Sequence, residues 1–224
     1  KILERLRDAT LREQMESEVA GIRIANRIPT WDDLMISHVP SAANRDLQGL
    51  TFPEAAKARG TSSCEKFVCD ILLEENLEVG HRMPPPSAEV WEQKDAEYMQ
   101  LLARQDYAVS SDGILVGDMP HPRAYGTFPR VIGRLRREFN TPLELLINRM
   151  TAFTAQRFKL NDRGLLRPGK AADIVIFDAD LVNDTATYDA PKKFPVGIEH
   201  VLVNGEIAVK YSSPTGVLAG RAIP

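Results

Sequence analysis

The chain has 224 residues, of which 43% are hydrophobic, and a formal net charge of −3. This composition suits one large domain or two small ones, and the lack of a long basic run argues against a nucleic-acid or membrane-surface partner. No apolar run approaches the roughly 18 residues that a membrane-spanning helix needs. The two cysteines, Cys64 and Cys69, match no zinc-ligand spacing, so we expect free thiols in a reducing cytoplasm.

The first elements are a helix and a short strand. Apolar residues recur at helical spacing over residues 2–19, and we expect an amphipathic helix that is interrupted near Asp8. A short apolar run at residues 34–36 predicts a buried strand that ends at Ser37 and His38.

Several helix starts carry recognisable capping patterns. Thr51–Glu54 and Ser62–Glu65 each read as a capping box, and Ser87 is placed to cap a helix that runs to about Arg104. Thr141–Glu144 places Thr, Pro and Glu at the cap, first and third helical positions, and so predicts another start. Residues 129–139 are expected to form a helix whose arginine-rich side faces solvent.

The stretch from residue 107 to residue 129 has the pattern of a functional site. Tyr107–Ser111 predicts a short strand, and the turn dipeptide Asp112–Gly113 ends it. A polar loop with His121, Arg123 and Tyr125 is expected to follow. An acid at the C-terminal end of a buried strand, before a long loop, is where α/β barrels hold their chemistry. The alternative is that Asp112 simply begins a turn.

The end of the chain is expected to be mainly β. Asp173–Asp178 is a short β-branched run bounded by acids, and Val196–Lys210 alternates around Asn204–Gly205. Asn-Gly between alternating apolar residues is the strongest short signal for a hairpin.

These motifs resemble a known family. The run GLLRPGKAADIVIFD at Gly164–Asp178 is similar to the end of the barrel in the metal-dependent amidohydrolase superfamily. The runs SSDG at Ser110–Gly113 and HPRAYGTFPR at His121–Arg130 narrow the resemblance to the D-aminoacylases, which are N-acyl-D-amino-acid deacylases.

The resemblance implies an α/β fold in two parts. Residues 1–160 would be the last strands and helices of a partial (β/α)₈ TIM-type barrel, and residues 161–224 a β-sandwich segment. A complete barrel takes about 250 residues and eight strands. We therefore expect the chain to be the C-terminal portion of a longer protein, and to need the missing N-terminal half of the barrel.

The resemblance also implies a reaction, the zinc-dependent hydrolysis of N-acyl-D-amino acids to a D-amino acid and a carboxylate. Asp112 would be the catalytic acid and base in contact with metal-bound water, and Arg123 would bind the substrate α-carboxylate. His121 and Ser37 are expected at the substrate. The zinc ligands would lie mostly outside this chain, because its histidines show no ligand spacing: His38, His81, His121 and His200. The isolated chain is then expected to be inactive.

Alternatives remain open for the residues and for the function. Arg123 could form a structural salt bridge, and each histidine could be an ordinary surface side chain. The protein could instead be a cyclic amidohydrolase of the dihydroorotase or hydantoinase type, or a non-catalytic stand-alone domain. We expect a cytoplasmic protein whose partner is a small-molecule N-acyl-D-amino acid, not a nucleic acid or a membrane.

Overall fold

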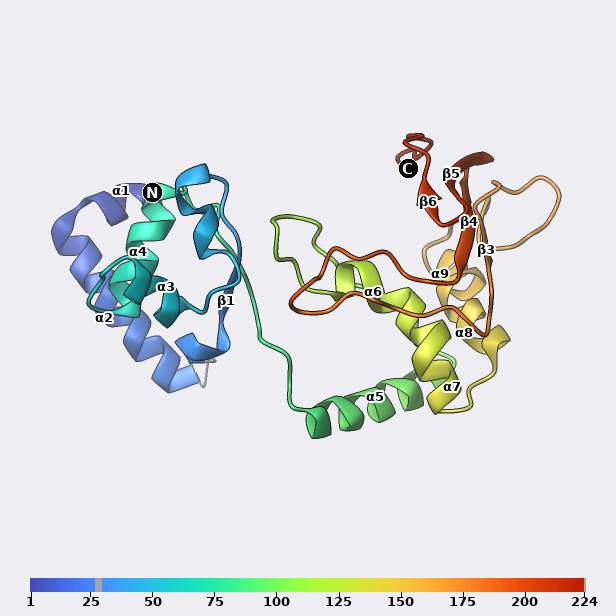
Figure 1. Cartoon of the computed structure of the whole chain (residues 1–224), viewed down its shortest axis with the longest axis horizontal. Coiled ribbons are helices and arrows are strands. Elements are labelled where there is room, and N and C mark those ends of the chain that lie inside the picture. Colours follow the sequence, from blue (N-terminus) through green and yellow to red (C-terminus); the bar gives the residue numbers. More distant parts are fainter. Residues whose placement is uncertain (27–29, 224) are drawn as a thin grey trace. The chain divides into compact units, whose positions relative to one another are not determined.

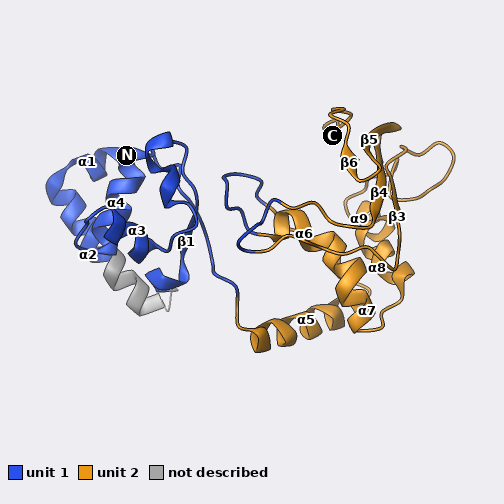
Figure 2. Cartoon of the chain, viewed as in Figure 1, with its two compact units in different colours: residues 1–85, 114–121, 188–192 blue, residues 86–113, 122–187, 193–224 orange. Residues whose placement is uncertain are grey.

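The computed structural model describes residues 1–26 and 30–223 as a mixture of helices and strands (Figure 1). The chain forms two units, and each is described by itself (Figure 2). The first unit comprises residues 1–85, 114–121 and 188–192, and the second comprises residues 86–113, 122–187 and 193–224. An α/β fold was expected and is found, whereas the boundary expected between residues 160 and 161 stays a prediction. Within the described residues, no helix is both long and apolar enough to cross a bilayer.

The helix expected at the start of the first unit is interrupted at Asp8, as predicted. It consists of α1 (Ile2–Arg7) and α2 (Ala9–Asn26). Asp8 has an extended backbone between them, and its Oδ1 accepts a hydrogen bond of 3.0 Å from the backbone N–H of Leu11. The carboxylate therefore satisfies one of the N–H groups that a helix start leaves without an intrahelical partner.

Capping residues begin the next two helices. At α3 (Phe52–Ala58), the Thr51 hydroxyl accepts from the N–H of Glu54 and the Glu54 carboxylate accepts from the N–H of Thr51, so the predicted capping box is confirmed. At α4 (Cys64–Glu74), the predicted box is wrong by one residue. Ser63, rather than Ser62, accepts the N–H of Lys66 and begins the helix.

The strand predicted after residue 34 is present as β1 (Met35–His38). It pairs antiparallel with β2 (Gly80–Arg82), with Met35 opposite Arg82 and an irregularity between Ile36 and His38. Adjacent strands of a (β/α)₈ barrel are parallel, so this pair does not have the arrangement expected for barrel neighbours.

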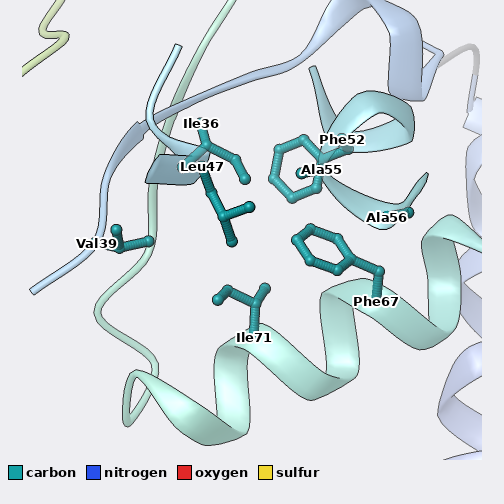
Figure 3. Close-up of a cluster of buried hydrophobic side chains, with 8 residues drawn as sticks. All are labelled: Ile36, Val39, Leu47, Phe52, Ala55, Ala56, Phe67 and Ile71. Carbon is teal, nitrogen blue, oxygen red and sulfur yellow. The ribbon is translucent and has the colours of Figure 1, made fainter. Parts of the chain in front are cut away.

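One hydrophobic core lies in the first unit, between β1, α3 and α4 (Figure 3). Its aromatic centre is Phe52, whose ring contacts Trp31 at 5.5 Å and Phe67 at 6.3 Å between centroids. The buried members are Ile36, Val39, Leu47, Phe52, Ala55, Ala56, Phe67 and Ile71. This core holds β1, and with it Ser37, against the helices of the unit.

The second unit contains several helices and an antiparallel sheet. The helices are α5 (Ala88–Ala103), α6 (Arg123–Arg130), α7 (Arg136–Glu138), α8 (Leu143–Met150) and α9 (Ala152–Arg157). The strands are β3 (Ile174–Phe177), β4 (Ile198–Val203), β5 (Glu206–Lys210) and β6 (Ser213–Pro214), which are neighbours in that order. Asn204 and Gly205 have φ of 49° and 86°, so the predicted Asn-Gly hairpin is confirmed.

The helix expected to begin at Pro129 begins earlier, at Arg123, so this predicted start is wrong. Helix α6 continues through a π-helical turn, Val131–Leu135, into α7. Arg123 and Tyr125 therefore lie on a helix and not in a loop. Pro129 lies inside the helix, just before the π-helical turn.

The basic side of this helix is also different from the prediction. Arg130 and Arg134 both donate to the buried carboxylate of Asp95 on α5. Arg136 and Arg137 donate to main-chain carbonyls, those of Ala179 and Val182 respectively. The arginines thus tie the helix to its neighbours, although Arg134 and Arg137 remain exposed.

Helix α8 was predicted correctly in position but not in its cap. Pro142 occupies the N-cap position, and no side-chain capping bond is made. The Thr141 hydroxyl instead donates to the carbonyl of Phe139 at 3.5 Å.

A second hydrophobic core lies in this unit. Its buried members are Met99, Leu102, Val109, Val131, Ile132, Leu135, Leu146 and Val182.

Candidate functional site

The segment before Asp112 has no regular secondary structure and belongs to no sheet in the described structure, so the strand predicted at Tyr107–Ser111 is wrong. Val109 is buried in the core of the second unit, which holds the segment in place. A strand also needs a neighbour to take its N–H and C=O groups. Such a neighbour cannot be foreseen from the apolar pattern of one segment.

Asp112 has a left-handed backbone, with φ of 45°. Aspartate adopts this conformation more readily than most side chains, and such positions cluster at functional sites. The Ser111 hydroxyl accepts the N–H of Gly113 at 3.2 Å. Gly113 is tightly placed, because a Cβ there would lie 2.9 Å from the Cα of Ala124. The backbone around the candidate catalytic acid is therefore closely constrained.

Arg123, in the first turn of α6, reaches back to this acid. Its Nη2 lies 2.7 Å from Oδ2 of Asp112, and the two side chains are 41% and 80% exposed. Ion pairs with this exposure typically contribute about 0–1 kcal/mol to stability. The structure therefore brings two of the predicted site residues together through a contact that adds little to the stability of the fold.

His121 lies in the first unit beside a residue that the sequence did not indicate. The hydroxyl of Tyr188 is 2.9 Å from Nε2 of His121, and the two rings meet edge to face with centroids 5.1 Å apart. Tyr188 in turn lies under the guanidinium of Arg82, whose central carbon is 5.1 Å from the ring centroid. No motif or spacing connects Arg82, His121 and Tyr188 in the sequence.

Ser37 is buried in β1, and its main chain supports the segment that precedes His121. Its carbonyl accepts the N–H of Met119 at 3.3 Å. Gly117 has φ of 84°, and a Cβ there would lie 2.4 Å from the Ser37 carbonyl oxygen, so only glycine fits this approach. The role of Ser37 as a substrate contact stays a prediction.

The described residues do not by themselves fit a metal site. They include no group of three or more His, Cys, Asp and Glu side chains placed to hold a metal ion, whereas a catalytic zinc takes three protein ligands. One carboxylate oxygen of Asp112, Oδ2, is in an ion pair with Arg123. We therefore assign no chemical step to a metal on the residues of this chain.

Comparison with known proteins identifies the class to which this fold and these residues belong. The model of the amidohydrolase family matches residues 79–209. This match includes Asp112, His121, Arg123 and Tyr188, and the chain belongs to that family.

Particular relatives narrow the similarity to deacylases. The chain is 34% identical to an N-acyl-D-glutamate deacylase over 221 residues (96% of this chain, 44% of the relative) and 36% identical to a D-aminoacylase over 179 residues (80% and 34%), both from Alcaligenes xylosoxydans xylosoxydans. It also resembles the crystal structure of an N-acyl-D-glutamate deacylase from Bordetella bronchiseptica in complex with zinc and a phosphonate inhibitor. That similarity has a TM-score of 0.65 and 30% identity, over 87% of this chain and 39% of the other.

The expected resemblance to D-aminoacylases is thus confirmed. The chain spans less than half the length of each of these relatives.

Proposed function

We propose that this chain is the C-terminal part of a zinc-dependent enzyme that hydrolyses N-acyl-D-amino acids to a D-amino acid and a carboxylate. The observation that carries the proposal is the contact between Asp112 and Arg123. A carboxylate suited to proton transfer and a guanidinium suited to carboxylate binding lie side by side. Both lie in the stretch where the sequence resembles the deacylases, and both are open to solvent.

Asp112 is proposed as the general acid and base. Amide hydrolysis requires one group to take a proton from the attacking water and a group to give a proton to the leaving nitrogen. A single carboxylate can do both in turn. The constrained backbone at residues 111–113 would hold the carboxylate in place while its exposed side chain remains within reach of a substrate.

Arg123 is proposed to bind the α-carboxylate of the substrate. Its guanidinium already pairs with a carboxylate, that of Asp112, and its planar shape allows it to bind a carboxylate through two N–H groups, which lysine cannot do. When the substrate carboxylate takes this place, Asp112 would be released from the ion pair. Substrate binding would then free the general base at the moment it is needed.

The remaining parts of the proposal concern the complete protein. Zinc would be bound by ligands that this chain does not itself assemble, while His121 and Ser37 would contact the substrate. Strand β1 and the segment at residues 107–111 would join a barrel completed by an N-terminal half, and residues 161–224 would form part of a β-sandwich. The shorter span of this chain relative to its relatives supports this arrangement.

The test is an assay of the complete protein that contains this chain, with N-acetyl-D-glutamate, N-acetyl-D-leucine, their L-enantiomers and a cyclic hydantoin as substrates. We expect release of the D-amino acid, and a loss of at least about 100-fold in kcat for Asp112→Asn, the scale of general acid–base catalysis. Asp106→Asn is the matched control, because Asp106 is also exposed and paired with an arginine, Arg104. Full activity of Asp112→Asn would contradict the proposed role, and ring opening without cleavage of acyl-D-amino acids would favour a cyclic amidohydrolase.

A further inference from the structure

Arg82, at the end of β2, is a buried arginine whose side chain forms hydrogen bonds to the main chain of two distant segments. It is 5% exposed. Its Nε donates to the carbonyl of Met119 at 3.1 Å, and its Nη2 donates to the carbonyl of Tyr188 at 3.0 Å. Within the described residues, Nη1 is the one buried side-chain nitrogen or oxygen that lacks a hydrogen-bond partner. This arginine therefore joins the segment that precedes His121 to the segment that carries Tyr188.

The same guanidinium also acts on the Tyr188 side chain. It lies over the ring face, 5.1 Å from the centroid, where a cation is attracted to the π electrons. Burial lowers the pKa of Arg82, and the nearby Tyr188 and Asp189 oppose that shift. The guanidinium nevertheless stays protonated, as arginine does in proteins. Tyr188 is thus held by its carbonyl and by its ring.

The orientation of Tyr188 determines the contact with His121. Its hydroxyl is 2.9 Å from Nε2, with the ring planes at 67°. A positive charge over the ring draws electron density away from the phenol oxygen. The hydroxyl therefore becomes a better hydrogen-bond donor. An imidazole nitrogen that accepts a hydrogen bond carries no proton, which places the proton of the neutral ring on the other nitrogen.

We propose that Tyr188, held by Arg82, donates to Nε2 of His121 and keeps this histidine in the tautomer with its proton on Nδ1. Arg82 and Tyr188 are then positioning residues for His121. The proposal rests on the proposed function only in giving His121 a role at the substrate. In that role His121 would present Nδ1–H as a hydrogen-bond donor in a fixed direction.

The first test is independent of catalysis. Imidazole ¹⁵N spectra of the 224-residue chain are recorded with labelled histidine, and His121 is assigned by the signal lost in His121→Gln. We expect a protonated Nδ1 and an unprotonated Nε2. Tyr188→Phe removes only the hydroxyl, and Arg82→Lys removes the planar guanidinium. Both should shift His121 to a mixture of tautomers while the other histidine signals stay in place.

Two matched controls are available in the chain. Tyr211 meets His200 edge to face at 4.9 Å with no hydrogen bond between them, so Tyr211→Phe should leave both His121 and His200 unchanged. Arg59, like Arg82, donates to a main-chain carbonyl, that of Ala43, and Arg59→Lys should also leave His121 unchanged. A proton on Nε2 in the unmodified chain, or an unchanged tautomer in both Tyr188→Phe and Arg82→Lys, would overturn the proposal.

A second readout connects the arrangement to the reaction. In the complete protein, Tyr188→Phe should lower kcat/KM by about tenfold or more, the scale seen when the supporting partner of a site histidine is removed. If the tautomer changes while kcat/KM does not, the positioning role is overturned and the deacylase proposal stands. If the unmodified protein hydrolyses no acyl-D-amino acid, the proposed function fails, and the spectra still decide the tautomer.

Discussion

Nη2 of Arg123 and Oδ2 of Asp112 are 2.7 Å apart, although the two residues lie on different segments of the second unit. The arginine comes from the first turn of α6, and the aspartate from a left-handed position after a segment without regular secondary structure. Because both side chains remain accessible, either can exchange its partner for a ligand. This exchange is the property on which the proposed reaction depends.

Arg123→Lys should weaken substrate binding in the complete protein more than it affects folding. A lysine keeps the charge but cannot pair with a carboxylate through two parallel N–H groups. We expect KM for N-acyl-D-amino acids to rise by about 10-fold or more, as for the loss of a charge-assisted hydrogen bond worth about 1.5–3 kcal/mol. Arg104→Lys, in another exposed pair with Asp106, should leave KM unchanged. Equal KM values for Arg123→Lys and the unmodified protein would show that Arg123 does not bind the substrate carboxylate.

Gly133→Ala should destabilise the second unit. A Cβ at this position in the π-helical turn would lie 2.2 Å from the carbonyl oxygen of Val182. Alanine normally favours a helix over glycine by about 1 kcal/mol, but overlap with a fixed backbone atom should cost more, about 2–4 kcal/mol in the free energy of unfolding. Urea unfolding measures the difference. Gly220→Ala is the control because nothing lies within 4 Å of its Cβ. A stabilised Gly133→Ala would show that the helix can move away from Val182.

Asp95→Asn should cost more than an ordinary surface substitution. This buried carboxylate accepts from both Arg130 and Arg134, at 2.8 and 2.5 Å. Its removal leaves the two guanidinium groups with longer contacts, from Arg130 to Asp184 at 4.0 Å and from Arg134 to Glu138 at 3.8 Å, and we expect a loss of about 2–4 kcal/mol in stability. Glu97→Gln on the same helix is the control, since the exposed Glu97 accepts a hydrogen bond from the exposed side chain of Gln93. If the two substitutions have equal effects on unfolding, the arginine-rich side is only a solvated face.

Glu75 should make the stability of the first unit depend on pH in the acidic range. Burial by itself raises the pKa of this carboxyl, but hydrogen bonds from Ser41 and Asn44 outweigh it, and the pKa lies below its ordinary value. A carboxyl with a lowered pKa in the folded state stabilises the fold above its unfolded pKa of about 4.3. That contribution is lost as pH falls through the lower, folded pKa.

Glu75→Gln tests this dependence. At pH 7 it should lower the free energy of unfolding by about 1–2 kcal/mol, because a neutral amide replaces a charged acceptor of three hydrogen bonds. The difference from the unmodified chain should shrink as pH falls below about 4. Glu78→Gln, at an exposed position, should have the same free energy of unfolding as the unmodified chain at pH 7 and at pH 3. A difference between Glu75→Gln and the unmodified chain that is constant from pH 7 to pH 3 would contradict the assignment.

The features predicted correctly from sequence are those decided by neighbouring residues. The Thr51 capping box and the Asn204–Gly205 hairpin involve groups only a few positions apart, so the sequence alone specifies them. The strand predicted at residues 107–111 failed because a strand needs a neighbouring segment with which to form a ladder. The helix start predicted at Pro129 failed because α6 begins earlier, at Arg123.

The same distinction holds at the candidate site. Asp112 and Arg123 lie in motifs that can be read along the chain, and the structure places them in contact. Tyr188 reaches His121, and Arg82 reaches Tyr188, only through folding, from segments on either side of His121 in the sequence. No pattern of spacing could have indicated them.

The π-helical turn at residues 131–135 fixes the phase of the helix that follows it. Each residue of an α-helix advances the direction of the next side chain by about 100°, and a π turn contains an additional residue. If all five residues of this turn were wound as ordinary α-helix, Arg136 and Arg137 would rotate away from the carbonyls of Ala179 and Val182. The wider winding of the turn thus sets which way the end of the helix points, and it keeps the last two arginines on the segment that leads to Tyr188.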